Sequence, residues 1–189
     1  MPITSDSTVA EVLDDYGKIT RAELKNWLPK GDPEDYLYGP MSDYPMRGGR
    51  MFRPSLCIAT AKVFGASLEQ VIPAAVSIEL LHNALLIHDD IEDESDERRG
   101  KPTLHKKIGT PLALNAGDSL AFLSLRPIIR GSASMGSDSI VRILEEFDQM
   151  AQQTAEGQAL DLGWRRDNHI ELCEADYLKM VLKKTCWLT

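Results

Sequence analysis

The sequence predicts an all-α protein that folds as a single domain over residues 1–189. Apolar residues recur at spacings of three and four along most of the chain, which is the period of an amphipathic helix. No segment shows the sustained alternation of β-branched residues that is typical of strands. Hydrophobic residues make up 43% and charged residues 26% of the chain, a composition typical of a globular domain with a sizeable core.

The N-terminal part is expected to contain two helices separated by a long loop. The first helix spans residues 7–28, with Ser7 as its cap and apolar residues at helical spacing from Val9 to Trp27. Residues 29–49 lose this period and are rich in proline and glycine, which predicts a loop, and long ordered loops are usually functional. Pro54 is well placed to begin the next helix, which ends near Gly65.

The following helix, from about Glu69 to Glu92, is apolar nearly all round and is therefore expected to lie at the centre of the core. A charged loop over residues 94–102 comes next. Three further helical patterns then lie between breaks rich in glycine, serine, aspartate or asparagine, at about 110–129, 137–162 and 173–187.

The net charge of −8 gives no indication of nucleic-acid binding, so an anionic ligand would have to meet a local cluster of lysines and arginines. The N-terminus lacks the basic start and apolar run of a signal peptide. We also expect no transmembrane segment, because no stretch comes near the roughly 18 apolar residues of a span. A cytoplasmic protein is the expectation.

Residues 87–105, IHDDIEDESDERRGKPTLH, hold the densest candidate site. Asp89 and Asp93 are four apart and Asp90 and Asp93 three apart, so a helix brings their carboxylates to adjacent parts of one face. Such carboxylates repel one another unless a cation lies between them, and Mg²⁺ prefers hard oxygen ligands. A solvated acidic helix end is the alternative. Arg98 and Arg99 follow closely, and guanidinium groups suit the oxygens of a diphosphate.

A second basic cluster, RGGRMFRP, spans residues 47–54, where Arg50 and Arg53 lie at the junction of a loop and a helix. Gly49 permits close backbone approach. A solvated basic loop would give the same pattern. His82 lies seven residues before Asp89, on the same helix face, and is either a core histidine or a donor to a ligand.

Taken together and in order, these motifs resemble those of the trans-isoprenyl (polyprenyl) diphosphate synthases. GGRMFRP and ELLHNALLIHDDIEDESDERRGKPTLH are similar to the family's glycine-rich basic segment and its first aspartate-rich motif. NAGDSL, EGQALDL and YLKMVLKKT resemble later landmarks, so the likeness runs from about Arg47 to Thr185. The resemblance implies an isoprenoid-synthase-type helical bundle around a central cavity, with residues 1–189 as the N-terminal portion of the synthase domain.

The resemblance also implies roles for single residues. Magnesium ions that bridge an allylic diphosphate would be bound by Asp89, Asp90 and Asp93. The same diphosphate would be contacted by Arg98, Lys184 and Thr185. Isopentenyl diphosphate would be held by Gly49, Arg50, Arg53, His82 and Arg99. Gln158 and Asp161 would face the cavity.

The implied reaction is ionisation of the allylic diphosphate, stabilised by metal and cationic side chains, followed by attack of the isopentenyl double bond. In this family, product length depends on the side chains just before the first aspartate. Here they are Ala84 and Leu85, neither of them aromatic, with Leu81 a turn earlier. This favours a geranylgeranyl (C20) or longer product.

Family members usually continue to a second aspartate-rich motif, and none is present in residues 1–189. We therefore expect a fragment or one part of a split enzyme, which by itself would ionise its substrate poorly. Homodimerisation is expected from the resemblance. Two rival functions remain open, namely a noncatalytic partner subunit of a synthase and a class I terpene cyclase. The aspartate motif with its arginines argues against the first, and Arg50, Arg53 and His82 argue against the second.

Overall fold

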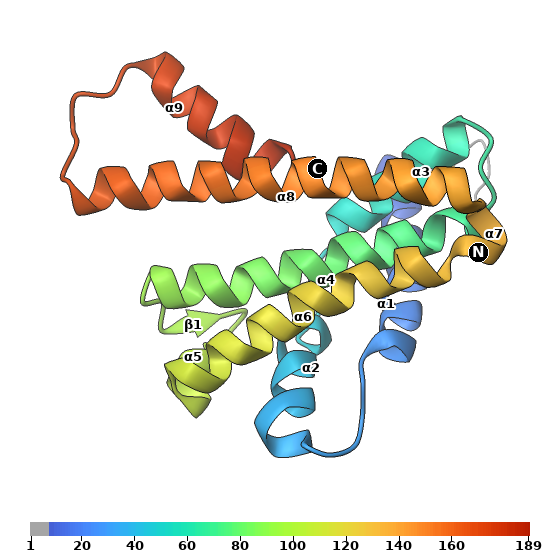
Figure 1. Cartoon of the computed structure of the whole chain (residues 1–189), viewed down its shortest axis with the longest axis horizontal. Coiled ribbons are helices and arrows are strands. Elements are labelled where there is room, and N and C mark those ends of the chain that lie inside the picture. Colours follow the sequence, from blue (N-terminus) through green and yellow to red (C-terminus); the bar gives the residue numbers. More distant parts are fainter. Residues whose placement is uncertain (1–7) are drawn as a thin grey trace. The chain divides into compact units, whose positions relative to one another are not determined.

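The computed structural model describes residues 8–189, and over these residues the chain is helical apart from one short hairpin and the connecting loops (Figure 1). The all-α prediction is thus confirmed. The chain forms two compact units, Met1–Gly136 and Ser137–Thr189. Each unit is described by itself, and the single domain expected over residues 1–189 stays a prediction.

The first unit contains most of the helices and the hairpin. Its longer helices are α1 (Val9–Trp27), α3 (Phe52–Val63), α4 (Leu68–Glu92) and α6 (Thr110–Arg130). Its shorter elements are the π-helix η1 (Glu34–Tyr38), α2 (Gly39–Met46), β1 (Glu97–Arg98), β2 (Lys101–Pro102), α5 (Leu104–Ile108) and α7 (Ser132–Met135).

The core of the first unit is built around α4, as its apolar sequence predicts. The helix packs along α6 on one side and against α3 on another (Figure 1). Ser77 donates to the carbonyl oxygen of Ser124 at 2.5 Å and so joins α4 to α6. The cap is Ser67, whose hydroxyl accepts from the backbone N–H of Gln70 in a capping box. Sequence pattern alone therefore located the central helix to within one residue at its start.

Of the helices in the described part of the chain, only α4 is long and apolar enough to cross a membrane by length and composition. This corrects the expectation that no segment reaches that length. In the folded protein, however, 61% of its most apolar window is buried. Such burial is typical of the core helix of a globular domain.

Other helix boundaries differ slightly from the predictions. Helix α1 is capped by Thr8, whose hydroxyl accepts from the backbone N–H of Glu11, while the expected Ser7 cap lies outside the described residues. Helix α3 begins at Phe52, two residues before Pro54, because a proline is tolerated throughout the first helical turn.

The prediction of one long loop over residues 29–49 was wrong. The structure places η1 and α2 within that range. Pro40 lies in the first turn of α2, where a missing N–H costs no hydrogen bond, so a proline that suggested a loop in fact begins a helix. Met41 and Tyr44 of this helix are buried in the core of the first unit. Tertiary burial thus stabilises a helix too short to be stable by itself.

The second unit is a helical hairpin of α8 (Ser137–Arg166), α9 (Glu174–Val181) and the π-helix η2 (Leu182–Cys186). The expected helix at 173–187 is present, but its last part widens into the π-helix. Gly157 of α8 makes close packing possible, since a Cβ atom there would lie 2.2 Å from the backbone nitrogen of Lys184. No side chain fits at that crossing, so η2 lies directly against α8.

Candidate active site

The aspartate motif lies where α4 ends, but its three carboxylates have different surroundings. Successive residues of a helix are about 100° apart around its axis, so Asp89 and Asp93 share a direction that Asp90 does not. Asp90 is fully buried, whereas the side chain of Asp89 is 28% exposed and Asp93, the C-terminal cap, is exposed. Two carboxylates therefore face outward and one faces the core.

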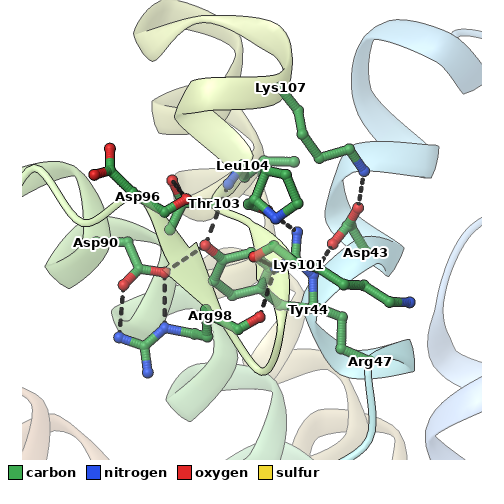
Figure 2. Close-up of polar contacts among 11 residues, drawn as sticks. Asp43, Tyr44, Arg47, Asp90, Asp96, Arg98, Lys101, Thr103, Leu104 and Lys107 are labelled. Atoms are coloured by element: carbon green, nitrogen blue, oxygen red, sulfur yellow. Dashed lines mark hydrogen bonds and ion pairs between the residues drawn. The ribbon is translucent and has the colours of Figure 1, made fainter.

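Both oxygens of Asp90 accept hydrogen bonds inside the protein (Figure 2). Arg98 donates from Nε to Oδ2 at 2.7 Å and from Nη2 to Oδ1 at 2.6 Å, a two-point ion pair. The hydroxyl of Tyr44 donates to Oδ2 as well. Nη2 of Arg98 lies 3.6 Å from Oδ2 of Asp89, so this guanidinium bridges the buried and the exposed aspartate.

Within residues 8–189, no three His, Cys, Asp or Glu side chains converge into a preformed metal site. The outward pair nevertheless fits magnesium, which commonly takes one or two carboxylates and completes its shell with substrate phosphates and water. Asp89 and Asp93 offer hard oxygen ligands one turn apart on α4. Asp90 would have to give up its bonds to Arg98 and Tyr44 in order to join them. Its role as a ligand stays a prediction.

The two arginines after the motif lie on the hairpin β1–β2 and contact different residues, Arg98 the buried Asp90 and Arg99 the segment at Gly49. Arg98 pairs opposite Lys101 in the ladder, which leaves Arg99 and Gly100 as a two-residue turn. Both turn residues have positive φ, 56° and 71°, as in the tight turns that suit a twisted hairpin. A positive φ is uncommon for arginine, so the backbone is held in a conformation that favours glycine or asparagine.

The side chain of Arg99 lies against Gly49, where a Cβ atom would be 2.8 Å from its Nη2. Gly49 also has a φ of 142°, so both the backbone conformation and the lack of space for a Cβ atom require glycine here. Arg21 of α1 donates from Nη2 to the carbonyl oxygen of Gly49 at 2.6 Å. The glycine-rich segment is thus held between an arginine of the hairpin and an arginine of α1.

Arg21, Arg53 and Arg99 all lie within electrostatic range of Glu79, a buried residue of α4. None of these arginines forms an ion pair with any residue in the described part of the chain, and the buried Nε atoms of Arg21 and Arg53 have no hydrogen-bond partner there. Glu79 instead accepts a hydrogen bond from the side-chain amide of Asn83 at 2.8 Å. Three guanidinium groups with one carboxylate nearby form a basic cluster whose charge favours an anion.

Burial and charge perturb the titrating groups of this arginine cluster. Desolvation raises the pKa of Glu79, and the three arginines partly oppose the rise. Desolvation also lowers the pKa of Arg53 and of Arg99. For His82, burial and then the charges of Arg53, Arg99 and Arg98 lower the pKa to about 3, so the imidazole is neutral at physiological pH. It can donate from one nitrogen and accept at the other.

The remaining predicted ligand contacts are exposed or lie in the second unit. Arg50 is exposed and precedes α3. In the second unit, the ammonium group of Lys184 pairs with Asp161, which also lies 3.3 Å from Nη2 of Arg165. Gln158 is half-buried on α8, and Thr185 is exposed on η2. The structure thus brings Asp161 and Lys184 together, while their approach to Asp89 stays a prediction.

The three candidate chain-length residues lie on α4 before the aspartates. Leu81, Leu85 and Asp89 are spaced by four, so they form one line along the helix. Ala84 is fully buried in the main core, while Leu85 is only partly buried. Of these positions, Leu85 is therefore the one at which a larger side chain disrupts the core least.

Sequence reasoning missed four residues of these clusters. Tyr44 and Arg47 lie in the segment wrongly expected to be a loop, and a helix start at Pro40 was the signal that could have located them. Glu79 is an acidic residue inside an apolar helix, and a buried charge often marks a site. Arg21 carries no such signal, because a single arginine on an amphipathic helix is ordinary.

Comparison with known proteins is consistent with this geometry. A short chain isoprenyl diphosphate synthase of Methanocaldococcus jannaschii is 37% identical over 163 residues, which are 86% of this chain and 47% of that protein. A geranylgeranyl diphosphate synthase of Methanosarcina mazei is 35% identical over 181 residues, 94% of this chain and 53% of that protein. The chain spans about half the length of the curated relatives it matches.

The fold is shared with solved structures as well. The geranylgeranyl pyrophosphate synthetase of Pyrococcus horikoshii has a TM-score of 0.87 and 31% identity, with 93% of this chain and 52% of that chain covered. The enzyme of the same name from Geoglobus acetivorans has a TM-score of 0.84 and 33% identity, with 93% and 56% covered. The family model for polyprenyl synthetase matches residues 34–189. Because that match covers most of the sequence, the chain belongs to the polyprenyl synthetase family.

Proposed function

We propose that this protein is a prenyltransferase that condenses isopentenyl diphosphate with an allylic diphosphate to form a linear trans-polyprenyl diphosphate. The observation that carries this proposal is the presence of two separate anion-binding clusters in the first unit. One is the outward pair Asp89 and Asp93 with Arg98. The other is the cluster of Arg21, Arg53 and Arg99, which has no counter-charge in ion-pair contact among residues 8–189.

Two anion-binding clusters are what a reaction between two diphosphates requires, and the two clusters would bind their diphosphates in different ways. The carboxylates require a cation between themselves and a phosphate, whereas the arginine cluster can bind a phosphate directly. A terpene cyclase acts on a single diphosphate and gives the arginine cluster no role. The geometry therefore supports the prenyltransferase over the cyclase.

In the proposed mechanism, Asp89 and Asp93 would hold Mg²⁺, which when bound would supply electrostatic stabilisation of a departing diphosphate. Arg98, fixed by Asp90, directs its remaining donors toward the same group. The second diphosphate is held by Arg21, Arg53 and Arg99, and the neutral imidazole of His82, which feels the charges of Arg53, Arg99 and Arg98, serves as a hydrogen-bonding group. These contacts bring the two reactants together and align them.

The proposed product is a C20 or longer chain. Ala84 and Leu85 place no aromatic ring before Asp89, and several relatives are named geranylgeranyl diphosphate synthases. Roles in substrate binding for Lys184, Thr185, Gln158 and Asp161 stay predictions. Homodimerisation and a cytoplasmic location also stay predictions.

The test is to incubate the purified protein with Mg²⁺, isopentenyl diphosphate and farnesyl diphosphate, and to analyse the dephosphorylated products by chain length. A C20 or longer alcohol is expected, and Asp89→Ala should abolish it. Asp96→Ala is the matched control, because Asp96 is an exposed aspartate near the motif that contacts Lys106. Calorimetry on the same samples should show separate binding of both diphosphates. Binding of both without any product would instead favour the partner-subunit function, and binding of the allylic substrate alone would favour the cyclase.

A further inference from the structure

We propose that Tyr44 of α2 and Arg47, which caps the end of that helix, are positioning residues for the allylic diphosphate. They clamp the Asp90–Arg98 pair and the hairpin, and thereby fix the direction in which Arg98 presents its donors. This inference rests on the proposed function. It assigns a role to a helix that carries none of the sequence-predicted site residues.

Tyr44 contributes through its hydroxyl group. Its side chain is 1% exposed, and the hydroxyl donates to Oδ2 of Asp90 while it accepts from the backbone N–H of Leu104 at 3.2 Å (Figure 2). One oxygen atom therefore connects the end of α4 to the start of α5. A phenylalanine would fill the same space but would leave both of these buried groups with fewer partners.

Arg47 fixes the hairpin itself. Its guanidinium donates to three backbone carbonyl oxygens of the hairpin, those of Arg98 at 3.2 Å, Lys101 at 3.4 Å and Pro102 at 2.7 Å. The guanidinium also lies 4.4 Å above the centre of the Tyr44 ring. Each strand of the hairpin is only two residues long. Both strands are thus held by the side chain of Arg47, which stacks on the ring of Tyr44.

The charge of Arg47 in the clamp formed by Tyr44 and Arg47 is balanced by Asp43. Asp43 accepts from Nε of Arg47 and from the ammonium group of Lys107, and these bonds hold the pKa of Asp43 below its usual range despite its burial (Figure 2). The side chain of Arg47 is 2% exposed, so its orientation is set by these contacts. A guanidinium fixed in this way transmits the position of α2 to the hairpin.

The consequence for the site follows from the geometry of Arg98. Its Nε and one Nη are directed at Asp90, so the position of Asp90 and of the hairpin backbone decides where the rest of the guanidinium points. Loss of the Tyr44 hydroxyl removes one donor from Asp90 and the acceptor of Leu104. The pair and the hairpin then sample more orientations, and an oriented two-point contact with a diphosphate becomes weaker.

The test compares Tyr44→Phe with Tyr38→Phe. Tyr38 packs against the same core from η1, and no hydrogen bond of its hydroxyl to another described residue occurs. Amide hydrogen exchange of residues 95–104 reports the order of the hairpin without any ligand. Calorimetry with farnesyl thiolodiphosphate, an allylic analogue that ionises slowly, in the presence of Mg²⁺ reports the allylic site. Isopentenyl diphosphate reports the arginine cluster.

Tyr44→Phe is expected to speed exchange in residues 95–104. It should also raise the Kd for the thiolodiphosphate about tenfold, as if one charged hydrogen bond between Arg98 and the diphosphate were lost. The Kd for isopentenyl diphosphate should change less than about twofold, and Tyr38→Phe should change neither. Unchanged exchange in Tyr44→Phe overturns the proposal, whether or not the melting temperature falls. Equal losses of affinity for both ligands also overturn it. If the wild-type protein binds no diphosphate, the proposed function fails, and hydrogen exchange alone decides whether the clamp exists.

Discussion

The guanidinium of Arg98 holds both carboxylate oxygens of Asp90, at 2.6 and 2.7 Å, and lies 3.6 Å from the carboxylate of its neighbour Asp89. Two adjacent aspartates of one motif therefore meet different conditions. Asp90 is an internal partner of the fold, and Asp89 is partly exposed and is the proposed ligand of the metal. Substitutions that remove the charge but keep the shape can separate these roles.

Asp90→Asn is expected to lower the free energy of unfolding by about 3 kcal/mol, because it leaves the Arg98 charge without its buried partner. Asp89→Asn should change stability by less than about 1 kcal/mol, since that side chain is partly exposed and solvent screens its charge. Urea unfolding followed by circular dichroism measures both values. Equal losses in the two variants would contradict the assignment of separate roles.

Arg99→Asn is expected to stabilise the protein while weakening anion binding. Asparagine adopts positive φ more readily than arginine, so the turn should gain about 1 kcal/mol. The same change removes one guanidinium from the arginine cluster. In the wild-type protein, replacing chloride with phosphate at constant ionic strength should raise the melting temperature, and in the variant this increase should be smaller. An identical phosphate effect in both proteins would argue against an anion site there.

The free energy of unfolding should decrease as the pH falls, because His82 is buried in its neutral form. Its pKa is about 3 in the folded chain and about 6.5 when unfolded. The unfolded state therefore binds the proton more tightly, and the free energy of unfolding falls as pH drops through the window from about 6.5 to about 3. His82→Gln should flatten this dependence by roughly 1 kcal/mol per pH unit between pH 6 and 4. Guanidinium unfolding at several pH values measures the slope, and parallel curves for the two proteins would count against this origin.

Two glycines of α8 should respond in opposite ways to the same substitution. Gly157→Ala places a Cβ atom against the backbone of Lys184, so α8 and η2 must separate at a cost of about 2 kcal/mol or more. Gly163→Ala meets nothing within 4 Å and should stabilise the helix by about 1 kcal/mol. Differential scanning calorimetry provides the comparison. A stabilised Gly157→Ala variant would contradict the close approach.

Product length is expected to respond to Leu85. Leu85→Phe places an aromatic ring one turn before Asp89, and chromatography of the dephosphorylated products should show a shift from C20 toward C15. Ala84→Phe is the companion variant, and because Ala84 is fully buried in the core, overpacking should cost about 1–3 kcal/mol of stability. An unchanged product pattern in a folded Leu85→Phe variant would rule out this position as the length determinant.

Local pattern predicted a large share of the fold. The period of apolar residues located α1, α4, α6 and α8, since helix formation and burial of one face are both local consequences of side-chain spacing. It failed over residues 29–49, where prolines and glycines were interpreted as a loop. In α2 the decisive contribution is burial of Met41 and Tyr44 against distant parts of the chain. The spacing of apolar residues within the segment does not indicate such contacts.

The candidate site divides in the same way. Acidic and basic residues gathered in one short segment identified the candidate site residues Asp89, Asp93, Arg98 and Arg99. The spacing of four placed the two outward aspartates on one side of a helix. Which aspartate faces the core, and where each arginine points, depends on residues that are close only after folding. Tyr44 reaches Asp90 across 46 positions and Arg21 reaches Gly49 across 28. Hydrogen bonds of that kind depend on how helices pack, because a donor and an acceptor far apart in sequence meet only when the core between them has formed.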